Sequence, residues 1–460
     1  MSPHWFAMSA AGGVLVAAVL SRGASDEPLR LMVVDPGHFH AALLQKEMLP
    51  GVSETVHIYA PLGPDLNAHL ARIAGFNTRA DHPTHWLTRI YAGPDYLDRL
   101  IAERPGNVAI LSGRNDRKID AVGRLLEAGI HVLADKPWII EPENLPKLEA
   151  ALRLADQRHL TAYDMMTQRY EIANLVQRAL VNDPAVFGDR VQGTAQEPAV
   201  TMESMHCLLK LVAGRPNLRP AWFFDVKQQG EGLTDVGTHL VDLVQWILFP
   251  DRAIDYRKDI QVLSGERRPT VLTLEQFQKV TGAPAFPDYL EPAVRDGRLE
   301  YFCNNTVDYT IRGARVRLIV RWDFEATAGS GDTELSTFRG SESRIDIRQG
   351  ADEHYRSELY VVPNRPDRRA AIRTALEHRL QAVAAAWPGL EIRDAAAGAF
   401  QILIPDRLRT GHEAHFALVG DQFRKYVAAP SSMPAWEEPN MLAKYYVTTR
   451  GVELARAAAK

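Results

Sequence analysis

A histidine and a carboxylate stand four residues apart in a glycine-bounded segment near the middle of the chain, residues 230–242. If this segment is helical, Asp235 and His239 lie on one helix face. A carboxylate beside a histidine fixes the tautomer of the ring and raises its basicity, as a general base requires. His239 is therefore a candidate general base with Asp235 as its partner. The structural alternative is a helix start capped by Thr234, with a buried histidine that serves packing.

A lysine follows an apolar run at residues 130–134, in the order Asp135, Lys136, Pro137. The run is typical of a buried strand. Ligands of open parallel sheets bind at the carboxyl ends of the strands, so Lys136 would point into a binding crevice. The alternative is a lysine in a surface loop.

A third segment, residues 35–40, joins a predicted strand to a predicted helix. Dinucleotide-binding folds carry G-x-G-x-x-G at this joint, where helix amides bind the pyrophosphate. Here only the middle glycine, Gly37, is present, and Asp35 and His40 replace the other two. We expect Asp35 to point away from the turn or to cap the helix.

The acid that binds the ribose of NAD is also missing from its usual place after the second strand. Ala60 and Pro61 stand there, and Asp65 is the nearest carboxylate. The choice between NAD and NADP therefore stays open, although we expect no strong demand for a 2′-phosphate.

Apolar runs and amphipathic stretches alternate over residues 29–165. Strands are predicted at 31–34, 56–60, 108–111, 130–134 and 160–163. Helices are predicted from 41 and at 96–103, 117–128 and 145–158. This alternation predicts an α/β fold with a Rossmann-type, doubly wound parallel sheet.

The pattern changes after Arg169. Helices are predicted at 170–181, 233–248, 412–427 and 440–458, with a loop-rich stretch between the first two. Strands are predicted at 260–263, 299–302, 307–311, 315–322, 344–347 and 359–362. Residues 315–322 largely alternate basic and apolar side chains, which indicates a sheet with one face in water.

Composition narrows the class of protein. The 460 residues are 46% hydrophobic and 24% charged, which is typical of a soluble enzyme and excludes a mostly disordered, collagen-like or polytopic membrane chain. Lys and Arg number 53 against 57 Asp and Glu, without a long basic run, so no nucleic-acid partner is expected. Two cysteines, Cys207 and Cys303, are too few for a disulfide framework or a four-cysteine zinc site.

Residues 1–28 are interpreted as a leader segment. Residues 5–20 are uncharged and mostly small or apolar, a length that suits a signal peptide better than a membrane span. No Lys or Arg precedes them, which argues against export. We expect an exported, periplasmic protein or one tethered to a membrane by residues 1–24. The alternative is a cytoplasmic enzyme with an unstructured start.

The lysine motif and the segment 230–242, in this order, resemble the E-K-P and G-G-x-x-x-D-x-G-x-H-x-x-D motifs of the Gfo/Idh/MocA oxidoreductase family. Residues 411–416 and 440–446 resemble the subgroup with a "putative oxidoreductase C-terminal domain". The resemblance implies a Rossmann domain over 29–165. It also implies a C-terminal α+β domain over 166–460, with an open, mainly antiparallel sheet that pairs chains into a homo-oligomer.

The resemblance also implies roles by position. Lys136 would contact cofactor and substrate, His239 would be the acid/base, and Asp235 would be its partner or a ligand of a substrate hydroxyl. Asp242 would be structural. The implied cofactor, NAD or NADP, would contact Gly37, His38, Phe39, His40, Ser112, Asn115, Asp135, Lys136, Pro137 and Arg169.

The sequence departs from the family pattern on the cofactor side. Asp135 replaces the glutamate of E-K-P, and Glu231 interrupts the glycines. Residues 112–115 read S-G-R-N in place of S-T-P-N, so Asn115 keeps the polar position.

Four further residues are candidate substrate ligands. Glu203 and His206 stand three apart, and Trp222 and Asp225 flank two phenylalanines. Aromatic rings beside polar groups suit a sugar, although aromatic rings are also common in cores. No metal is expected, because the H-E-A-H at residues 412–415 lacks the spacing of a zinc helix; His412 is interpreted as a helix start.

Three functions are consistent with these residues. The leading hypothesis is an NAD(P)-dependent oxidoreductase that acts on a hydroxyl of a sugar, polyol or glycoside, with Lys136 and His239 at the reacting carbon. The second is an NAD-dependent glycosidase or lyase that recycles its bound cofactor. The third is a non-catalytic sugar-binding relative that has lost its cofactor.

Overall fold

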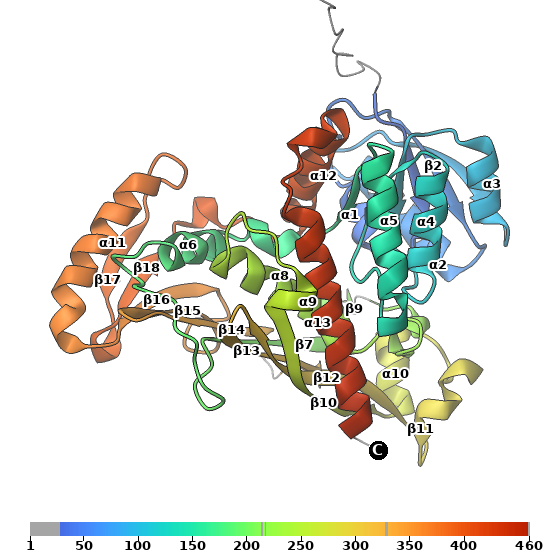
Figure 1. Ribbon diagram of the computed structural model, residues 1–460. Helices are drawn as coiled ribbons and strands as arrows, with labels where there is room; N and C mark the ends of the chain where they lie inside the picture. The colour runs from blue at the N-terminus through green and yellow to red at the C-terminus, as the bar shows by residue number, and fades with distance from the viewer. Residues whose placement is uncertain (1–27, 213–214, 217, 327–329, 459–460) are drawn as a thin grey trace, which may run out of the picture.

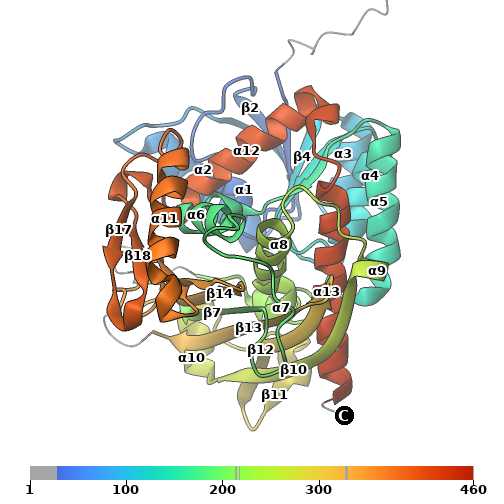
Figure 2. The same cartoon turned by 60° about the vertical axis from the view of Figure 1, so that its left-hand side comes forward.

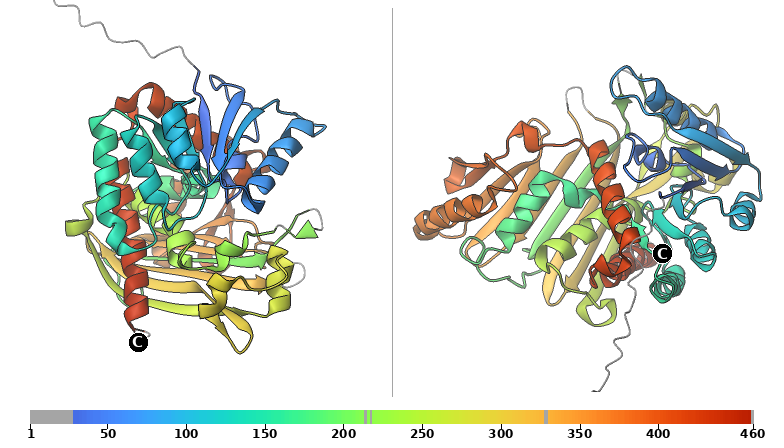
Figure 3. Two further views of the ribbon diagram at one scale, coloured as in Figure 1. Left: turned by 90° about the vertical axis from the view of Figure 1, so that its right-hand side faces the viewer. Right: turned by 90° about the horizontal axis from the view of Figure 1, so that it is seen from above.

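The computed structural model describes residues 28–212, 215–216, 218–326 and 330–458, and two β-sheets dominate it (Figure 1). A six-stranded parallel sheet comes first in the chain, and a mainly antiparallel sheet of ten strands follows. In the left view of Figure 3 the first sheet and its helices lie above the second sheet. The predicted fold class is thus confirmed: a Rossmann-type sheet followed by an open, mainly antiparallel one.

The first sheet has the strand order β3-β2-β1-β4-β5-β6. Its strands are β1 (Leu31–Val34), β2 (Thr55–Ala60), β3 (Leu87–Ala92), β4 (Val108–Leu111), β5 (His131–Ala134) and β6 (Ala162–Asp164). Its helices are α1 (His40–Leu43), α2 (Pro64–Thr78), α3 (Tyr96–Glu103), α4 (Lys118–Glu127) and α5 (Leu145–Gln157). The order reverses between β1 and β4, which is where ligands of such sheets bind.

Burial explains which of these strands the sequence reveals. All residues of β1 and β4 are buried, as expected for central strands covered by helices on both faces, and both match their predicted ranges. The sequence pattern does not reveal α2 and β3. β3 is an edge strand whose Leu87 and Ile90 are 59% and 50% exposed, so it lacks a buried apolar run.

The second sheet has the order β10-β12-β13-β7-β14-β15-β16-β18-β17, with β11 beside β12. Its strands are β7 (Val200–Leu209), β10 (Ile260–Leu272), β11 (Val294–Arg295), β12 (Arg298–Ile311), β13 (Ala314–Glu325), β14 (Thr333–Arg339), β15 (Ser343–Gln349), β16 (Glu358–Pro363), β17 (Glu391–Asp394) and β18 (Phe400–Leu403). A separate pair is β8 (Leu211–Val212) and β9 (Arg215–Pro216). The accompanying helices are α6 (Ile172–Val181), α7 (Gly232–Asp235), α8 (Gly237–Leu248), α9 (Tyr256–Asp259), α10 (Leu274–Thr281), α11 (Arg369–Val383), α12 (His412–Ala428) and α13 (Glu437–Ala458).

β7 corrects the expectation of a loop-rich stretch after α6. It lies inside the second sheet, parallel to β13 and antiparallel to β14. Its sequence mixes polar and apolar residues without clean alternation, and pairing on both sides makes it a strand. The alternating residues 315–322 form most of β13, where Val316, Leu318 and Val320 are fully buried, as predicted.

The helix expected at 233–248 is two helices, α7 and α8, which meet at Val236. Gly232 starts α7 against β12, where a Cβ atom would lie 1.9 Å from the carbonyl oxygen of Cys303. Leu233 N donates to Asn305 Oδ1 at 2.9 Å, which ties this start to the sheet. Asp235 therefore ends one helix and His239 lies in the first turn of the next.

The two C-terminal helices, close to their predicted ranges, return to the first sheet. Phe416, Val419 and Phe423 of α12 share a core with β1 and β2. Met441 and Tyr445 of α13 pack in the core beneath α4 and α5. Figures 1 and 2 show α13 running from the first sheet down to β10 of the second. Residues from the end of the chain thus complete the N-terminal half.

The predicted leader, residues 1–28, lies outside the described residues except for its last one. Among the residues that the structure describes, no helix combines the length and apolar character of a membrane span.

Candidate active site

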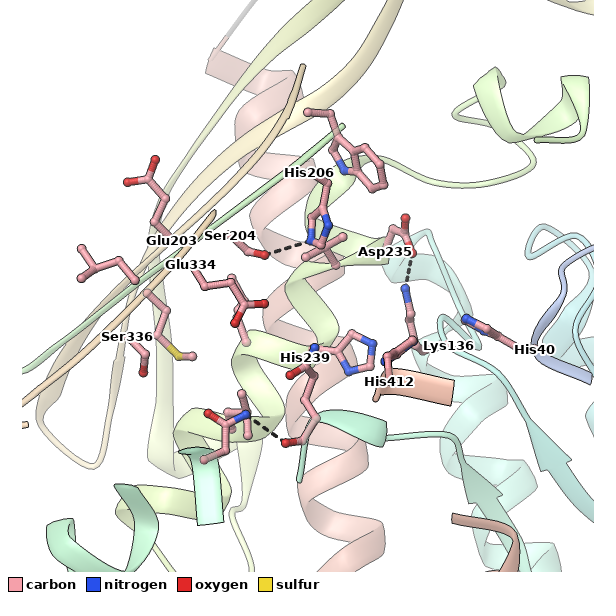
Figure 4. A pocket seen from close by; sticks show the side chains of 18 of the residues that line it. His40, Lys136, Glu203, Ser204, His206, Asp235, His239, Glu334, Ser336 and His412 are labelled. Atoms are coloured by element: carbon pink, nitrogen blue, oxygen red, sulfur yellow. Dashed lines mark hydrogen bonds and ion pairs between the residues drawn. The ribbon is translucent and has the colours of Figure 1, made fainter. Parts of the chain in front are cut away.

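A cavity of about 200 Å³ lies where the carboxyl edge of the first sheet faces the second sheet. Both sheets contribute to its walls, as Figure 4 shows. Its ionisable lining residues are His38, His40, Lys136, Glu203, His206, Lys210, Arg219, Asp235, His239, Glu334 and His412. A concave site with several convergent polar groups is typical of a small-molecule site.

Lys136 and Asp235 form a buried ion pair on one wall of this cavity (Figure 4). Lys136 follows β5 and Asp235 ends α7, and each side chain is 9% exposed. Burial raises the pKa of Asp235, but the charge and the hydrogen bond of Lys136, with a smaller effect of Arg219, together hold this pKa below its ordinary value. Both residues were predicted to lie in one site, and the structure brings them together.

His239 lies beside this pair, and its ring points toward Lys136 and His412 in Figure 4. Its Nδ1 is buried and has no hydrogen-bond partner among the described residues. Burial, followed by the charge of Lys136, lowers the pKa of His239 well below its ordinary value. The imidazole is therefore neutral and able to accept a proton. The carboxylate of Asp235 binds Lys136, so the expected support of His239 by Asp235 is not what the structure has.

The opposite wall carries a hydrogen-bonded chain on the second sheet. His206 Nδ1 lies 3.0 Å from Asp332 Oδ2, and Lys210 Nζ lies 2.5 Å from the same oxygen. The Oγ of Ser204 lies 2.9 Å from His206 Nε2, so the hydroxyl donates when the ring carries its proton on Nδ1. This arrangement orients the His206 ring at the cavity surface.

Glu334 lies beside this chain, because β14 pairs it directly with Ser204 of β7. Burial, with the neighbouring charge of Glu171, raises the pKa of Glu334 to about 7. The carboxyl group of Glu334 is therefore partly protonated at neutral pH. Sequence patterns did not reveal Glu334 and Ser204, because only the pairing of β7 with β14 brings them to the cavity, nor Asp332, which contacts His206.

The four expected substrate residues are separated. On strand β7, Glu203 and His206 point to opposite faces, since an offset of three residues changes sides. Glu203 forms an ion pair with Arg321 at 3.0 Å, and its carboxylate points away from Lys136 in Figure 4. Asp225 accepts hydrogen bonds from Lys227 N and from the side chain of Gln228, both at 2.9 Å. His206 and Glu203 both line the cavity, but Glu203 directs its carboxylate to Arg321, and Trp222 and Asp225 are not among the lining residues.

Trp222 lies over the turn at residues 35–40 instead of in the cavity. A Cβ atom on Gly37 would lie 2.9 Å from Trp222 Cζ2, so only glycine fits there. Trp222 Nε1 donates to Asp65 Oδ2 at 2.9 Å, and Arg114 Nη1 lies 3.3 Å from the same oxygen. Asp65, the nearest carboxylate after the second strand, therefore reaches the turn.

A second cavity, of about 430 Å³, lies at the point between β1 and β4 where the strand order reverses. Asp35, Pro61, Tyr96, Gly113, Arg114 and Lys118 are among its lining residues. Asp35 adopts a φ of 43°, the left-handed conformation that favours glycine, which fits its place at the first glycine position. Its carboxylate lies 3.8 Å from Arg114 Nη1, and burial raises its pKa.

His38, His40 and Asp135 converge between the two cavities. Asp135 Oδ2 lies 3.2 Å from His40 Nδ1 and 3.6 Å from His38 Nδ1. The other oxygen, Oδ1, forms an ion pair with the buried ammonium of Lys118, a residue that no sequence pattern had indicated. Burial lowers the pKa of both histidines well below the ordinary value, so both rings are neutral.

The remaining expected cofactor residues are Phe39, Ser112, Asn115, Pro137 and Arg169. Ser112 is buried, and its Oγ donates to His38 O at 2.9 Å, while Asn115 accepts from Lys118 Nζ at 2.6 Å. Phe39 lines the first cavity, and Pro137 is buried. The structure does not bring Arg169 to either cavity. Its guanidinium binds the carboxylates of Asp242 and Glu437, so Asp242 belongs to a buried ion-pair cluster outside both cavities.

His412 begins α12, as predicted, and also lines the first cavity. Burial lowers its pKa to about 4. His415 accepts or donates a hydrogen bond at Thr410, 2.9 Å away, and lies among the buried residues of α12.

The Rossmann-type sheet, the mainly antiparallel second sheet and the lysine and histidine between them have the architecture of Gfo/Idh/MocA-type oxidoreductases. The family model described as "Putative oxidoreductase C terminal domain" matches residues 176–456, more than half of the chain. The chain therefore belongs to the family of oxidoreductases that this C-terminal domain defines.

Solved structures agree with this assignment. A "putative oxidoreductase" from Parabacteroides merdae ATCC 43184 is 44% identical, with a TM-score of 0.92 over 95% of this chain and 100% of that chain. GenD2 from gentamicin A biosynthesis, solved with NAD, is 14% identical with a TM-score of 0.55, over 96% and 98% of the two chains. KijD10, a 3-ketoreductase from Actinomadura kijaniata solved with NADP and TDP-benzene, is 14% identical with a TM-score of 0.55, over 93% and 98%. Among curated proteins, none matches the chain.

Proposed function

We propose that this protein is an NAD(P)-dependent oxidoreductase that acts on a hydroxyl group of a sugar, polyol or glycoside. The observation that carries the proposal is the convergence of Lys136, Asp235 and His239 in one cavity at the carboxyl edge of the parallel sheet. The cavity holds charged and hydroxyl-bearing side chains on both walls, which suits a substrate with several hydroxyl groups.

The residues of the crevice fit a nicotinamide dinucleotide. The cavity at the strand-order reversal would hold the adenosine half, and Asp65 has the carboxylate that a ribose diol requires. The bound cofactor would accept and return a hydride in the first cavity. A carboxylate at this position opposes a 2′-phosphate, which favours NAD over NADP.

The side chains of the first cavity have separate tasks in this proposal. Neutral His239 accepts the proton of the substrate hydroxyl. The ammonium of Lys136 lies against the same oxygen and stabilises the negative charge that develops there. Asp235 holds Lys136 in place through their buried ion pair.

The test of this proposal starts with the protein as purified. Mass spectrometry of the supernatant after heat denaturation should find NAD(H), and calorimetry on nucleotide-free protein should give tighter binding of NAD(H) than of NADP(H). A panel of polyols and methyl glycosides should then include one that reduces the nicotinamide. Absence of binding by either dinucleotide would instead support a non-catalytic relative.

A second candidate function, redox-neutral cleavage of a glycoside, is favoured by the opposite wall. An oxidation alone needs one proton acceptor, yet Glu334 and His206 form a second acid and base there. After oxidation of the sugar, His206 would accept a proton from the carbon next to the carbonyl, and Glu334 would donate its proton to the leaving oxygen. Glu334→Gln should then stop product release while the first reduction of the nicotinamide persists.

We also propose a homo-oligomer that pairs through the second sheet. Residues of β10, β12 and β13 line an open groove of about 410 Å³ there, which includes Arg268, Asn304 and Arg321. Light scattering of the full chain during size-exclusion chromatography would test this: a mass of 51.3 kDa would count against it.

A further inference from the structure

Two histidines and one carboxylate at the first turn have the geometry of a metal site. One ring nitrogen of His38, one ring nitrogen of His40 and a carboxylate oxygen of Asp135 all lie within 4.8 Å of one another. Ligands bound at about 2.0–2.2 Å to one ion lie about 3.0–3.6 Å apart. The two distances from Asp135 Oδ2, 3.2 Å to His40 and 3.6 Å to His38, are in this range without any movement of the chain.

An unpartnered nitrogen points to a ligand at the same place. Nδ1 of His38 is buried and makes no hydrogen bond among the described residues. A buried polar atom without a partner costs about 1–3 kcal/mol, so such atoms normally have one.

The surroundings hold these donors in place. The backbone of His38 is fixed on both sides by Ser112, because His38 N donates to Ser112 O at 2.6 Å and Ser112 Oγ donates to His38 O at 2.9 Å. The His40 ring packs on Phe416, with 4.7 Å between ring centres. Lys118 occupies the second oxygen of Asp135, so only Oδ2 faces the histidines. Partners of this kind orient the ligands of metal sites.

We infer that His38, His40 and Asp135 bind a divalent first-row transition metal ion. Two imidazoles and one carboxylate suit Zn²⁺, Fe²⁺ or Co²⁺ better than Mg²⁺ or Ca²⁺, which prefer oxygen. Three protein ligands leave positions open on the ion. His38 and His40 line the first cavity, so an oxygen of water or of a substrate there would complete the coordination. A contact between ion and substrate rests on the proposed function; the site itself does not.

The charge of Lys118 sets a limit on this site. Its ammonium is 1% exposed and shares the carboxylate with the ion. A cation at this distance opposes a second cation, so the affinity should be lower than that of a closed zinc site with thiolate ligands. An anionic ligand in the open positions should therefore strengthen metal binding.

The test uses the full chain, stripped with a chelator and titrated with Co²⁺. We expect one ion per chain and a visible absorption band of cobalt bound to nitrogen. His38→Gln should weaken Co²⁺ binding by more than the roughly 100-fold typical of outer-shell changes, and Asp135→Asn should do the same. The matched control is His412→Gln, which removes a histidine of the same cavity outside the donor set and should leave binding unchanged.

Two results would overturn the inference: no Co²⁺ or Zn²⁺ bound by the wild type, or equal binding by the wild type and His38→Gln. If Asp135→Asn fails to fold because Lys118 loses its partner, His38→Gln carries the test, since His38 Nδ1 has no hydrogen bond to lose. Nucleotide content is measured on the same samples. If the protein contains nucleotide but binds no metal, only this inference is overturned. If it binds metal but contains no nucleotide, only the proposed cofactor is overturned.

Discussion

The ammonium of Lys136 and the carboxylate of Asp235 form an ion pair between the two halves of the molecule, 99 residues apart in the chain. Lys136 follows strand β5 of the parallel sheet, and Asp235 belongs to the helix that rests on the second sheet. The pair therefore fixes the position of a reactive lysine and also links the two halves. Its removal should affect stability and turnover separately.

Lys136→Met should abolish turnover and lower the free energy of unfolding by about 3–5 kcal/mol, because it leaves a buried carboxylate unpaired. The double variant Lys136→Met, Asp235→Leu should recover most of this stability while turnover stays absent. Denaturant unfolding and turnover assays measure the two effects. Lys147→Met is the control, because its ion pair with Asp120 is about half exposed and should change stability by less than about 1 kcal/mol. Equal losses for both lysines would contradict a special role of Lys136.

His239→Gln should lower kcat by about 10²–10⁴-fold and leave dinucleotide binding intact, because a general base contributes this much. Since burial lowers the pKa of His239, the ring stays neutral as the pH falls through 6.5. The decline of wild-type kcat/KM on acidification should therefore begin below pH 6.5. His85→Gln, on the exposed pair with Glu54, serves as the control. A near wild-type kcat in His239→Gln would show that another group is the base.

Glu334→Gln should change the pH dependence of stability. The pKa of Glu334 is 4.5 unfolded and about 7 folded, so its contribution is complete below pH 4.5 and is lost as the pH rises through 7. Glutamine mimics the protonated acid at every pH. The variant should nearly match the wild type at pH 4 and exceed it by up to about 3 kcal/mol at pH 8. Thermal unfolding at both pH values measures this, and equal differences at the two would mean that Glu334 titrates normally.

Arg169→Met should destabilise the protein by about 3–5 kcal/mol, because it leaves Asp242 and Glu437 without their buried guanidinium. Arg99→Met removes an exposed pair with Glu103 and should cost less than about 1 kcal/mol. Chemical denaturation compares the two. We expect unchanged dinucleotide affinity in Arg169→Met at temperatures where it is folded, and a selective loss of affinity would return Arg169 to the cofactor site.

We propose that residues 1–24 direct export or tether the chain to a membrane. Fusion of this segment to an alkaline phosphatase reporter should give periplasmic activity, and deletion of the segment should leave the protein in the cytoplasm. Sequencing the mature N-terminus distinguishes cleavage from tethering. A reporter without activity would favour the cytoplasmic alternative.

Much of the first sheet could be predicted because central parallel strands are buried on both faces and read as apolar runs. The strands at Leu31–Val34 and Val108–Leu111 and the helix at Tyr96–Glu103 have their expected bounds. Lys136 and His239 could be named as site residues because each follows a local pattern, a strand end or a helical spacing. Their shared cavity followed from the carboxyl edge of the sheet, where ligands bind.

Other features depend on pairings between distant segments, which local patterns do not contain. The second acid and base arise because β14 places Glu334 opposite Ser204. Helical spacing suggested that Asp235 supports His239, but the break at Val236 and the charge of Lys136 gave Asp235 a different partner. Likewise, Lys118 begins helix α4 and Asp135 follows strand β5, and the fold buries them together. Because Lys118 binds one carboxylate oxygen of Asp135, only the other oxygen is left for His38 and His40. The sequence alone determined which residue types are present; the tertiary structure decided which of them meet.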